Sequence, residues 1–405
     1  MVKVAILGYG TVGSGVATVI EENNALISNR IGDDIEVKYI LDLREFPGDP
    51  NESKVVHDIN IIVEDPEVSV VCETMGGVGA AYAFTKNCLE KGKSVCTSNK
   101  ELVAKHGPEL LKMAADHDCS YFFEASVGGA IPIIRPIESC LTAEKVERIL
   151  GILNGTTNYM LTKMEREGAD YATVLKEAQD LGYAERNPEA DVEGHDACRK
   201  IAILSSLMLR KNIDSENIPT EGITKITAED FKFANEAGYT IKILGVSEAV
   251  SEEEARVYVS PLLIPLTHPI AMVNDVFNAI FVTGNMLGDC MFYGKGAGKL
   301  PTASAVVADV VKAAKHIGKN VRYIWEAKDA KLASLDDVKR KFFIRTSNDY
   351  AAEVQELIPY GVAIDNRKVP TQFGYITPEM TEAEFAAVAA KLGDKMLGRL
   401  RVHNA

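Results

Sequence analysis

Acidic side chains crowd one short stretch of the chain, LGYAERNPEADVEGHDACRK at residues 181–200. Five carboxylates precede the lysine that closes it: Glu185, Glu189, Asp191, Glu193 and Asp196, followed by Lys200. On a helix, Asp196 and Lys200 would share a face because they are four residues apart. Most such pairs are solvated and contribute little to stability. Here turn-forming residues interrupt the preceding segment and the apolar run IAIL follows the lysine, which favours a desolvated, functional pair.

The cluster suits an amino-acid substrate that also carries an alcohol. A substrate ammonium needs carboxylates, a substrate carboxylate needs hydrogen-bond donors, and oxidation of an alcohol needs a group that exchanges a proton. We expect charged Lys200 to protonate the developing alkoxide when an aldehyde is reduced, and neutral Lys200 to accept the proton in reverse. Neighbouring carboxylates raise the pKa of a lysine and hinder its use as a base. The hypothesis therefore predicts that alcohol oxidation rises with pH above neutrality, while aldehyde reduction does not.

A second motif points to a dinucleotide. The stretch GYGTVG places Gly8, Gly10 and Gly13 in GxGxxG spacing after a strand pattern and before a helix pattern. Glycines there allow a tight turn and let backbone N–H groups approach a pyrophosphate at the helix N-terminus. Asp42 ends the second strand pattern, where an acidic residue binds the ribose 2′-hydroxyl of NAD. Arg44 is placed to meet the 2′-phosphate of NADP or to lie on the surface, so the coenzyme preference stays open.

The elements around this motif alternate between strands and helices over residues 1–135. Strands are predicted at VKVAILG, IEVKYILD, VSVVCE, KSVCTS and CSYFFE, and helices from Thr11, around 82–90 and around 107–116. This alternation predicts an α/β domain of the Rossmann type, a doubly wound parallel sheet covered by helices.

The pattern changes over residues 136–301 to an α+β mixture, interpreted as a substrate and dimerisation domain. Helices are predicted at 157–167, 171–181 and 194–208, with longer strands at TIKILGVSEAV and EARVYVSPLL. A long Ala/Val helix within 302–320 is expected to return to the first domain. Residues 341–405 follow the order βαββαβ, and Thr381 and Glu384 form a capping-box signature for its second helix.

Composition bounds the class of protein. The 405 residues exceed the roughly 250–300 at which single cores stop growing, so two or three domains are expected. The net charge of −14 argues against nucleic-acid or membrane partners. No apolar run reaches the roughly 20 residues of a membrane span, and MVKVAILGYG leaves no room for a signal peptide, so a cytoplasmic location is expected. The seven cysteines and seven histidines lack zinc-site spacing.

With these residues assembled, the chain resembles the homoserine dehydrogenase family. Seven motifs in order carry the resemblance: GYGTVG, ETMGG, TSNKELVA, EASVGGAIPII, GILNGTTNYML, the acidic stretch above, and YGKGAGKLPTASAV. The resemblance implies NAD(P)-dependent interconversion of L-homoserine and L-aspartate 4-semialdehyde, in the pathway from aspartate to threonine, methionine and isoleucine. The chain begins at the nucleotide-binding strand, so no fused kinase is expected.

The resemblance also assigns roles to residues. It implies that Lys100 and Lys200 are catalytic, and that homoserine is bound by Gly155, Thr156, Tyr183, Glu185, Asp191 and Asp196. The coenzyme residues expected from motif and resemblance are Gly8, Gly10, Thr11, Val12, Gly13, Asp42, Arg44, Gly76, Ser98, Lys100 and Gly296. In EASVGGAIP the resemblance implies a monovalent cation site, sodium, formed by Glu124 and the main-chain carbonyls of Val127, Gly129 and Ile131. Oxygen ligands suit a hard cation.

Two departures from the family pattern leave alternatives open. Leu41 stands where NADP-using relatives have an arginine, so NAD is expected to be accepted, alongside NADP or without it. The tail resembles an ACT domain, an amino-acid-sensing module, but NDYA at 348–351 replaces its usual Pro-Gly pair. The tail is therefore interpreted as a regulatory module or a dimer interface, and a homodimer or a dimer of dimers is expected.

Two other functions compete with this interpretation. One is another Rossmann-type amino-acid dehydrogenase, against which the seven motifs weigh. The other is a catalytically inactive protein that binds coenzyme and senses amino acids through its tail. The joint presence of Lys100, Glu185, Asp196 and Lys200 argues for an enzyme. His195, beside Asp196, is an alternative proton shuttle, although the lysine already fills that role.

Overall fold

The structure is a computed structural model that describes residues 1–403, and the chain forms two compact units. The first unit contains Met1–Val146, Ala202–Glu216 and Gly284–Lys331, and the second contains Glu147–Ile201, Asn217–Thr283 and Leu332–Ala405. Within the part of the chain that the structure describes, no helix is long and apolar enough to cross a membrane.

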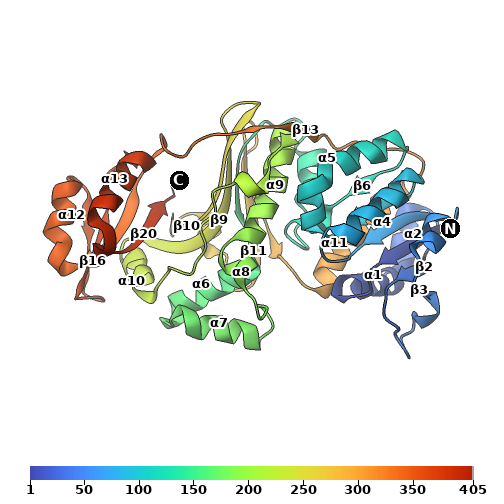
Figure 1. The fold of residues 1–405 in the computed structure, drawn as a ribbon, viewed down its shortest axis with the longest axis horizontal. Helices are drawn as coiled ribbons and strands as arrows, with labels where there is room; N and C mark the ends of the chain where they lie inside the picture. The colour runs from blue at the N-terminus through green and yellow to red at the C-terminus, as the bar shows by residue number, and fades with distance from the viewer. Residues whose placement is uncertain (404–405) are drawn as a thin grey trace. The chain divides into compact units, whose positions relative to one another are not determined.

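A six-stranded parallel sheet forms the centre of the first unit (Figure 1). Its strands are β1 (Val2–Leu7), β2 (Ile35–Leu41), β3 (Val55–Val56), β4 (Val68–Glu73), β5 (Ser94–Thr97) and β6 (Tyr121–Phe122). Their order is β3-β2-β1-β4-β5-β6, which is the doubly wound dinucleotide-binding order. The Rossmann prediction is confirmed. The order reverses between β1 and β4, so ligands are expected at the carboxyl ends of these two strands.

Helices cover this sheet. They are α1 (Thr11–Glu22), α2 (Asn24–Ile31), α3 (Ile59–Val63), α4 (Gly79–Glu90), α5 (Lys100–Asp116) and α11 (Lys299–Ala314). Helix α11 packs closely on α1, because a Cβ added to Gly15 would lie 2.9 Å from the carbonyl oxygen of Lys299. The long Ala/Val helix of the sequence thus lies in the same unit as the glycine motif.

Helix α5 differs from its prediction. It begins at Lys100, about two turns before the expected start near Gly107, because the side chain of Asn99 caps it by accepting the N–H of Leu102 at 3.1 Å. Gly107 and Pro108 suggested a helix start, yet both lie inside the helix. Gly107 is needed there for packing, since a Cβ at this position would lie 2.8 Å from the ring of Trp325.

The second unit combines helices with a mixed sheet. Its helices are α6 (Gly155–Glu167), α7 (Tyr171–Asp180), α8 (Glu189–Val192), the first part of α9 (His195–Leu209), and α10 (Ala228–Glu236). Its central strands are β7 (Val146–Ile152), β9 (Tyr239–Ala249), β10 (Glu254–Pro265) and β11 (Phe277–Gly284), in the order β11-β7-β9-β10. Strands β9 and β10 pair along their whole length as an antiparallel hairpin.

The tail shows the predicted βαββαβ order. Its elements are β16 (Phe342–Ser347), α12 (Ala351–Leu357), β17 (Val362–Ile364), β18 (Gln372–Ile376), α13 (Glu382–Leu392) and β20 (Met396–Val402). The capping box is present, with Thr381 and Glu384 each accepting the other's backbone N–H. Strand β20 also pairs in parallel with β10, with Leu262 opposite Arg401, so the tail extends the sheet of the second unit.

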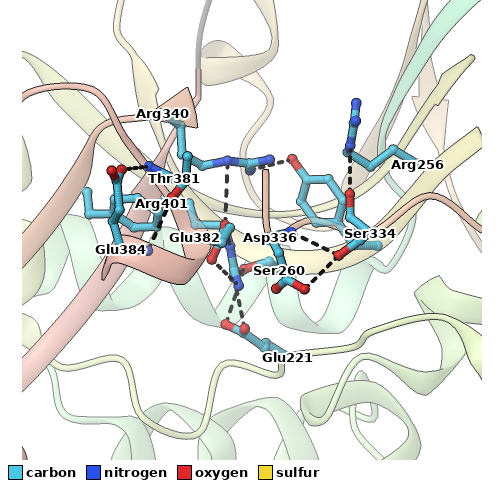
Figure 2. A network of polar contacts seen from close by, with 12 residues as sticks. Glu221, Arg256, Ser260, Ser334, Asp336, Arg340, Thr381, Glu382, Glu384 and Arg401 are labelled. Carbon is cyan, nitrogen blue, oxygen red and sulfur yellow. Dashed lines mark hydrogen bonds and ion pairs between the residues drawn. The ribbon is translucent and has the colours of Figure 1, made fainter. Parts of the chain in front are cut away.

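Charged side chains reinforce this junction (Figure 2). Arg401 donates to Glu382 at 2.5 Å, to Glu221 at 2.8 Å and to Ser260 at 3.0 Å. A second, buried pair joins Arg345 of β16 to Asp230 of α10 at 2.7 Å. The tail is therefore joined to the rest of the unit by backbone pairing and by ion pairs.

The remaining strands are short or peripheral. They are β8 (Lys211–Asn212), β12 (Gly288–Lys295), β13 (Glu326–Asp329), β14 (Lys331–Leu332), β15 (Lys339–Arg340) and β19 (Met380–Thr381). Strand β8 pairs with β13, and β15 pairs with β19.

Candidate active site

Lys200 and Asp196 form a buried ion pair on α9. The Lys200 Nζ lies 2.7 Å from Asp196 Oδ2, and the two side chains expose only 10% and 5% of their surface. The same ammonium donates to the main-chain carbonyl of Leu153 at 2.7 Å. Removing two charges from water costs several kcal/mol per ion, so this pair differs from the solvated pairs common at this spacing. The lysine head is held in one direction by two acceptors.

Asn154 joins the acidic residues to the start of α6. Its Nδ2 donates to Asp191 Oδ1 at 2.7 Å and to Asp196 Oδ2 at 2.9 Å. Its Oδ1 accepts the N–H of Thr157 at 2.9 Å and so caps α6. The sequence interpretation missed this residue, although an asparagine directly before Gly-Thr-Thr at a strand-to-helix junction was a signal for a cap.

The other predicted substrate residues surround the start of α6. Gly155 opens the helix, and a Cβ there would lie 2.8 Å from the carbonyl oxygen of Val276. Thr156 donates through its hydroxyl to the carbonyl of Tyr183 at 2.6 Å, which ties the helix to the acidic loop. Glu185 is exposed on that loop. Among the described residues its carboxylate makes no hydrogen bond or ion pair, so Glu185 is not brought onto the Asp191–Asp196–Lys200 cluster by any contact.

The glycine motif forms the turn from β1 to α1. Gly8 has a φ of +89°, which favours glycine, and a Cβ on Gly13 would lie 1.9 Å from the carbonyl oxygen of Gly8. Thr11 and Val12 begin α1 directly after this turn. The backbone can therefore approach a pyrophosphate at the N-terminus of α1.

A pocket of about 500 Å³ adjoins this turn. Its lining includes the predicted coenzyme residues Gly8, Gly10, Asp42, Arg44 and Gly76, together with Leu41, Leu43, His57, Thr74, Met75, Ala80 and Phe84. The size and the mixture of apolar and polar side chains suit a nucleoside. The lining of this pocket does not include Ser98, Lys100 or Gly296.

Asp42 is the polar centre of the pocket. Its Oδ2 accepts the N–H of Tyr9 at 2.8 Å, and Arg44 contacts both carboxylate oxygens at 2.9 Å. The hydrogen bonds from Arg44 hold the pKa of Asp42 well below its usual range. His57 Nδ1 lies 2.7 Å from the carbonyl oxygen of Asp42, and this bond, with Glu45, raises the pKa of His57. Asp42 and Arg44 thus form one unit, and His57 was a lining residue that the sequence interpretation missed.

Lys100 begins α5 next to a buried polar network. Asn99 caps the helix and donates through Nδ2 to the carbonyl of Gly77 at 2.6 Å. Its backbone N–H donates to the Thr97 hydroxyl at 2.9 Å, and that hydroxyl donates to the buried carboxyl of Glu73. Burial raises the pKa of Glu73 to about 7. The N–H of Ser98 donates to the carbonyl oxygen of Glu73 at 3.2 Å. This hydrogen bond joins the end of β4, at Glu73, to the residues that lead into α5 at Lys100.

The Glu124 side chain organises the proposed cation loop. Its carboxylate accepts the backbone N–H groups of Ile133 at 2.6 Å, Ile134 at 2.9 Å and Arg135 at 2.7 Å. Both of its oxygens are engaged by these donors, so the carboxylate is held in one orientation. Asp309 accepts the Glu124 N–H at 2.8 Å, and burial raises the pKa of Asp309 to about 7.

Gly296 packs against this loop. A Cβ on Gly129 would lie 2.5 Å from the carbonyl oxygen of Gly296, and the N–H of Ala130 donates to the carbonyl of Lys295 at 3.1 Å. Gly129 also has a φ of +55°, so both space and backbone conformation require glycine there. The glycine run at 294–298 therefore supports the 127–131 loop.

Other chemistries find no support among the residues that the structure describes. No group of three His, Cys, Asp or Glu side chains is placed to hold a metal ion. Five of the seven free cysteines are buried, and burial raises the pKa of the Cys88 and Cys119 thiols to about 12. Such thiols are poor nucleophiles at neutral pH. His195 is exposed at the first position of α9.

Known proteins resemble both parts of this chain. A family model described as homoserine dehydrogenase matches residues 132–311, and one described as homoserine dehydrogenase, NAD binding domain, matches residues 8–124. A homoserine dehydrogenase of Bacillus subtilis (strain 168) is 39% identical over 350 residues, which cover 85% of this chain and 81% of that protein. One of Corynebacterium glutamicum is 42% identical over 321 residues, covering 78% of this chain and 72% of that protein.

Solved structures of homoserine dehydrogenases also resemble this chain, one of them over its full length. A homoserine dehydrogenase from Thiobacillus denitrificans superposes with a TM-score of 0.88 at 34% identity, covering 100% of this chain and 98% of that chain. A hyperthermophilic archaeal homoserine dehydrogenase solved in complex with NADPH gives a TM-score of 0.65 at 26% identity, covering 77% of this chain and 97% of that chain. From these matches, the parallel sheet with its glycine turn and the buried lysine on α9, the chain belongs to the homoserine dehydrogenase family, whose members are NAD(P)-dependent oxidoreductases.

Proposed function

We propose that this enzyme interconverts L-homoserine and L-aspartate 4-semialdehyde with Lys200 as the group that exchanges the proton. The observation that carries this assignment is the buried Lys200–Asp196 pair, with the ammonium directed by the Leu153 carbonyl. In oxidation, the C4 hydroxyl of homoserine gives its proton to neutral Lys200. In reduction, charged Lys200 returns a proton to the forming alkoxide. A nicotinamide coenzyme, which the glycine turn and Asp42 would hold, would supply the hydride chemistry.

The acidic residues hold the substrate ammonium in this proposal. The carboxylates of Asp191 and Asp196 lie close together, since the Asn154 amide donates a hydrogen bond to each of them. The N-terminus of α6, with Gly155 and Thr156, offers backbone N–H groups to the substrate carboxylate, since helix N-termini favour anions. Tyr183 and Glu185 complete the site from the exposed loop, where Glu185 is available to a ligand. Lys100 is assigned a second catalytic role by the family resemblance.

For the coenzyme, we propose that NAD is accepted and that Arg44 allows NADP as well. The Asp42 carboxylate suits a ribose 2′-hydroxyl, whereas Arg44 and His57 offer positive charge to a 2′-phosphate. The existing Asp42–Arg44 pair supports dual use, because Arg44 already offsets part of the carboxylate's charge.

A monovalent cation, sodium, fits the 124–131 loop in this proposal. Its ligands are the main-chain carbonyls of Glu124, Val127, Gly129 and Ile131. The engaged Glu124 carboxylate and the close approach of Gly129 to Gly296 support a rigid loop of carbonyls. A neutral carbonyl set suits a hard cation of single charge. The cation would hold the loop in shape.

The remaining proposals concern the whole protein. A homodimer or a dimer of dimers is proposed, together with a cytoplasmic location. The tail is proposed to act as an ACT-like regulatory or dimerisation module.

Coenzyme reduction with homoserine, followed by absorbance of the reduced nicotinamide, tests the proposed reaction. We expect turnover with NAD, with NADP or with both, and none with L-serine, whose hydroxyl is one carbon nearer the ammonium. Equal rates with serine would contradict a site built for homoserine. If neither coenzyme supported turnover of homoserine, the proposed reaction would be wrong.

A further inference from the structure

We infer that Asn154 is a positioning residue that fixes Asp191, Asp196 and, through Asp196, the proton-exchanging Lys200. The inference rests on the proposed function and adds a residue to its site. Asn154 is 6% exposed and makes contacts with three different helices of the second unit, α6, α8 and α9.

The oxygen and the nitrogen of the Asn154 side-chain amide contact different parts of the site. Its Oδ1 accepts both the N–H of Thr157 at 2.9 Å and the Thr157 hydroxyl at 3.0 Å. These donors fix which way the amide faces, since an amide nitrogen cannot accept them. The NH₂ group therefore points away from α6, and its two hydrogens reach Asp191 at 2.7 Å and Asp196 at 2.9 Å.

Asn154 bridges the two carboxylates with a neutral group. Two carboxylates at one site repel, and one of them tends to take up a proton. A lysine or arginine in the place of Asn154 would relieve the repulsion but would compete with the substrate ammonium. The amide instead donates one hydrogen to each carboxylate and adds no charge. The bridge thus holds Asp191 and Asp196 close together, where both can receive the ammonium of homoserine.

The same amide reaches Lys200 through a shared oxygen. Asp196 Oδ2 accepts from Asn154 and from Lys200, each below 3 Å. The residue before Asn154, Leu153, accepts from Lys200 at 2.7 Å. The junction between β7 and α6 thus directs the lysine head from two sides. Without the amide, Asp196 can rotate about its side-chain bonds, and the ammonium then loses its fixed direction.

Asn154→Ser separates this role from helix capping. Serine caps a helix about as well as asparagine, but its short hydroxyl cannot bridge both carboxylates. We expect kcat/KM for homoserine to fall about 10- to 100-fold, the size of losing hydrogen bonds to charged groups. Both constants should change: KM rises because the ammonium site loosens, and kcat falls because Lys200 is misdirected. The Kd of NADH, measured by fluorescence titration, should stay within twofold.

Asp170→Ala is the matched control for the cap. Asp170 caps α7 with the same pair of contacts, to the N–H and the hydroxyl of Thr173, both at 2.9 Å, and it bridges nothing in the cluster. Its loss should lower the Tm and leave kcat and KM unchanged. Asn154→Asp is the second variant, because it keeps the shape and the cap while placing a third carboxylate beside the other two. It should lose more activity than Asn154→Ser.

A double substitution tests whether Asn154 acts through Lys200. In a Lys200→Ala background, Asn154→Ser should lower kcat by less than twofold, since residues that act as a unit are not additive. A full additional loss in that background would contradict the inference. So would wild-type KM and kcat in a folded Asn154→Ser or Asn154→Asp protein. If the wild-type protein itself did not oxidise homoserine, the proposed function would be wrong, which is a different outcome from a wrong role for Asn154.

Discussion

Lys200 differs from the other helical lysine–carboxylate pairs of this chain in its burial. Lys112–Asp116 and Lys176–Asp180 have the same spacing, but their side chains expose 75% and 56%, and 76% and 67%. Those pairs are screened by water and contribute little. The sequence spacing alone could not separate the three pairs. The apolar run after Lys200 was the distinguishing signal, because residues 201–204 are all buried.

At the same scale, Asp42 should govern the choice of coenzyme. Asp42→Asn removes the negative charge that repels a 2′-phosphate, while Arg44 stays in place. The ratio of kcat/KM with NADP to that with NAD should rise at least about tenfold, the effect of one favourable charge contact. Steady-state kinetics with both coenzymes measures this ratio. Arg44→Ala is the paired variant and should lower the ratio, and a rise in both variants would exclude the assigned roles.

Glu73 makes stability depend on pH. Its pKa rises from an ordinary 4.5 to about 7 because of burial, so the folded protein binds this proton more tightly than the unfolded chain does. Its contribution to the free energy of unfolding is complete below pH 4.5 and is lost as pH rises through about 7. This loss amounts to roughly 3 kcal/mol.

Glu73→Gln, which imitates the neutral acid, should remove that dependence. Relative to the wild type, the variant should gain stability between pH 5 and pH 8 in urea denaturation. Asp309 titrates in the same range in both proteins, so the comparison isolates Glu73. A difference between the two proteins that is constant over this pH range would refute the assignment.

The sequence predicted correctly which segments form helices and which form strands, but it misplaced the ends of some of them. Short β-branched runs alternating with helical patterns predicted the parallel strands, and the capping box predicted the start of α13. The start of α5 was misplaced because Gly107 and Pro108 look like a helix boundary, while the determining contacts are the Asn99 cap and the ring of Trp325. A local pattern cannot show which ring a glycine faces.

The buried pair between α10 and β16 should hold these two elements together. Asp230 and Arg345 expose 2% and 4% of their side chains, and Arg345 also donates to Thr227 and to the carbonyl of Leu397. Asp230→Ala would leave a buried, unpaired guanidinium, which costs about 3–5 kcal/mol. Chemical denaturation measures this change.

The exposed pair Asp365–Arg367 provides the control for this prediction. Asp365→Ala should leave the free energy of unfolding almost unchanged, because both partners of that pair are solvated. Equal effects of the two substitutions would show that the buried pair does not join the tail to the second unit.

For the whole molecule, the order of the parts could be predicted from the sequence, but the attachment of the tail could not. The βαββαβ order was evident from its alternating runs. The pairing of β20 with β10 joins residues far apart in the chain, and no local signal specifies it. Likewise, the motifs led to Asp191, Asp196 and Lys200, whereas Asn154 emerged only from its contacts. The sequence can indicate that an asparagine caps a helix. It cannot show that the amide nitrogen of the same side chain donates to two aspartates.

The proposed assembly is also tested on the whole protein. Light scattering at micromolar concentration should give twice or four times the mass of one chain. The Arg401–Glu382–Glu221 contacts lie within one chain, so they should form in any oligomeric state. A monomer mass would contradict the proposed dimer.

The proposed role of Lys200 is to exchange the proton in homoserine oxidation. Its most direct test is the rate of homoserine-dependent NAD and NADP reduction at pH 9 for the wild type and for Lys200→Ala, with the Kd of each reduced coenzyme measured alongside. We expect wild-type turnover, a loss of about 10²–10⁴-fold in kcat for the variant, as for a removed acid–base group, and unchanged coenzyme binding. A Lys200→Ala enzyme that keeps wild-type kcat would show that Lys200 does not exchange the proton.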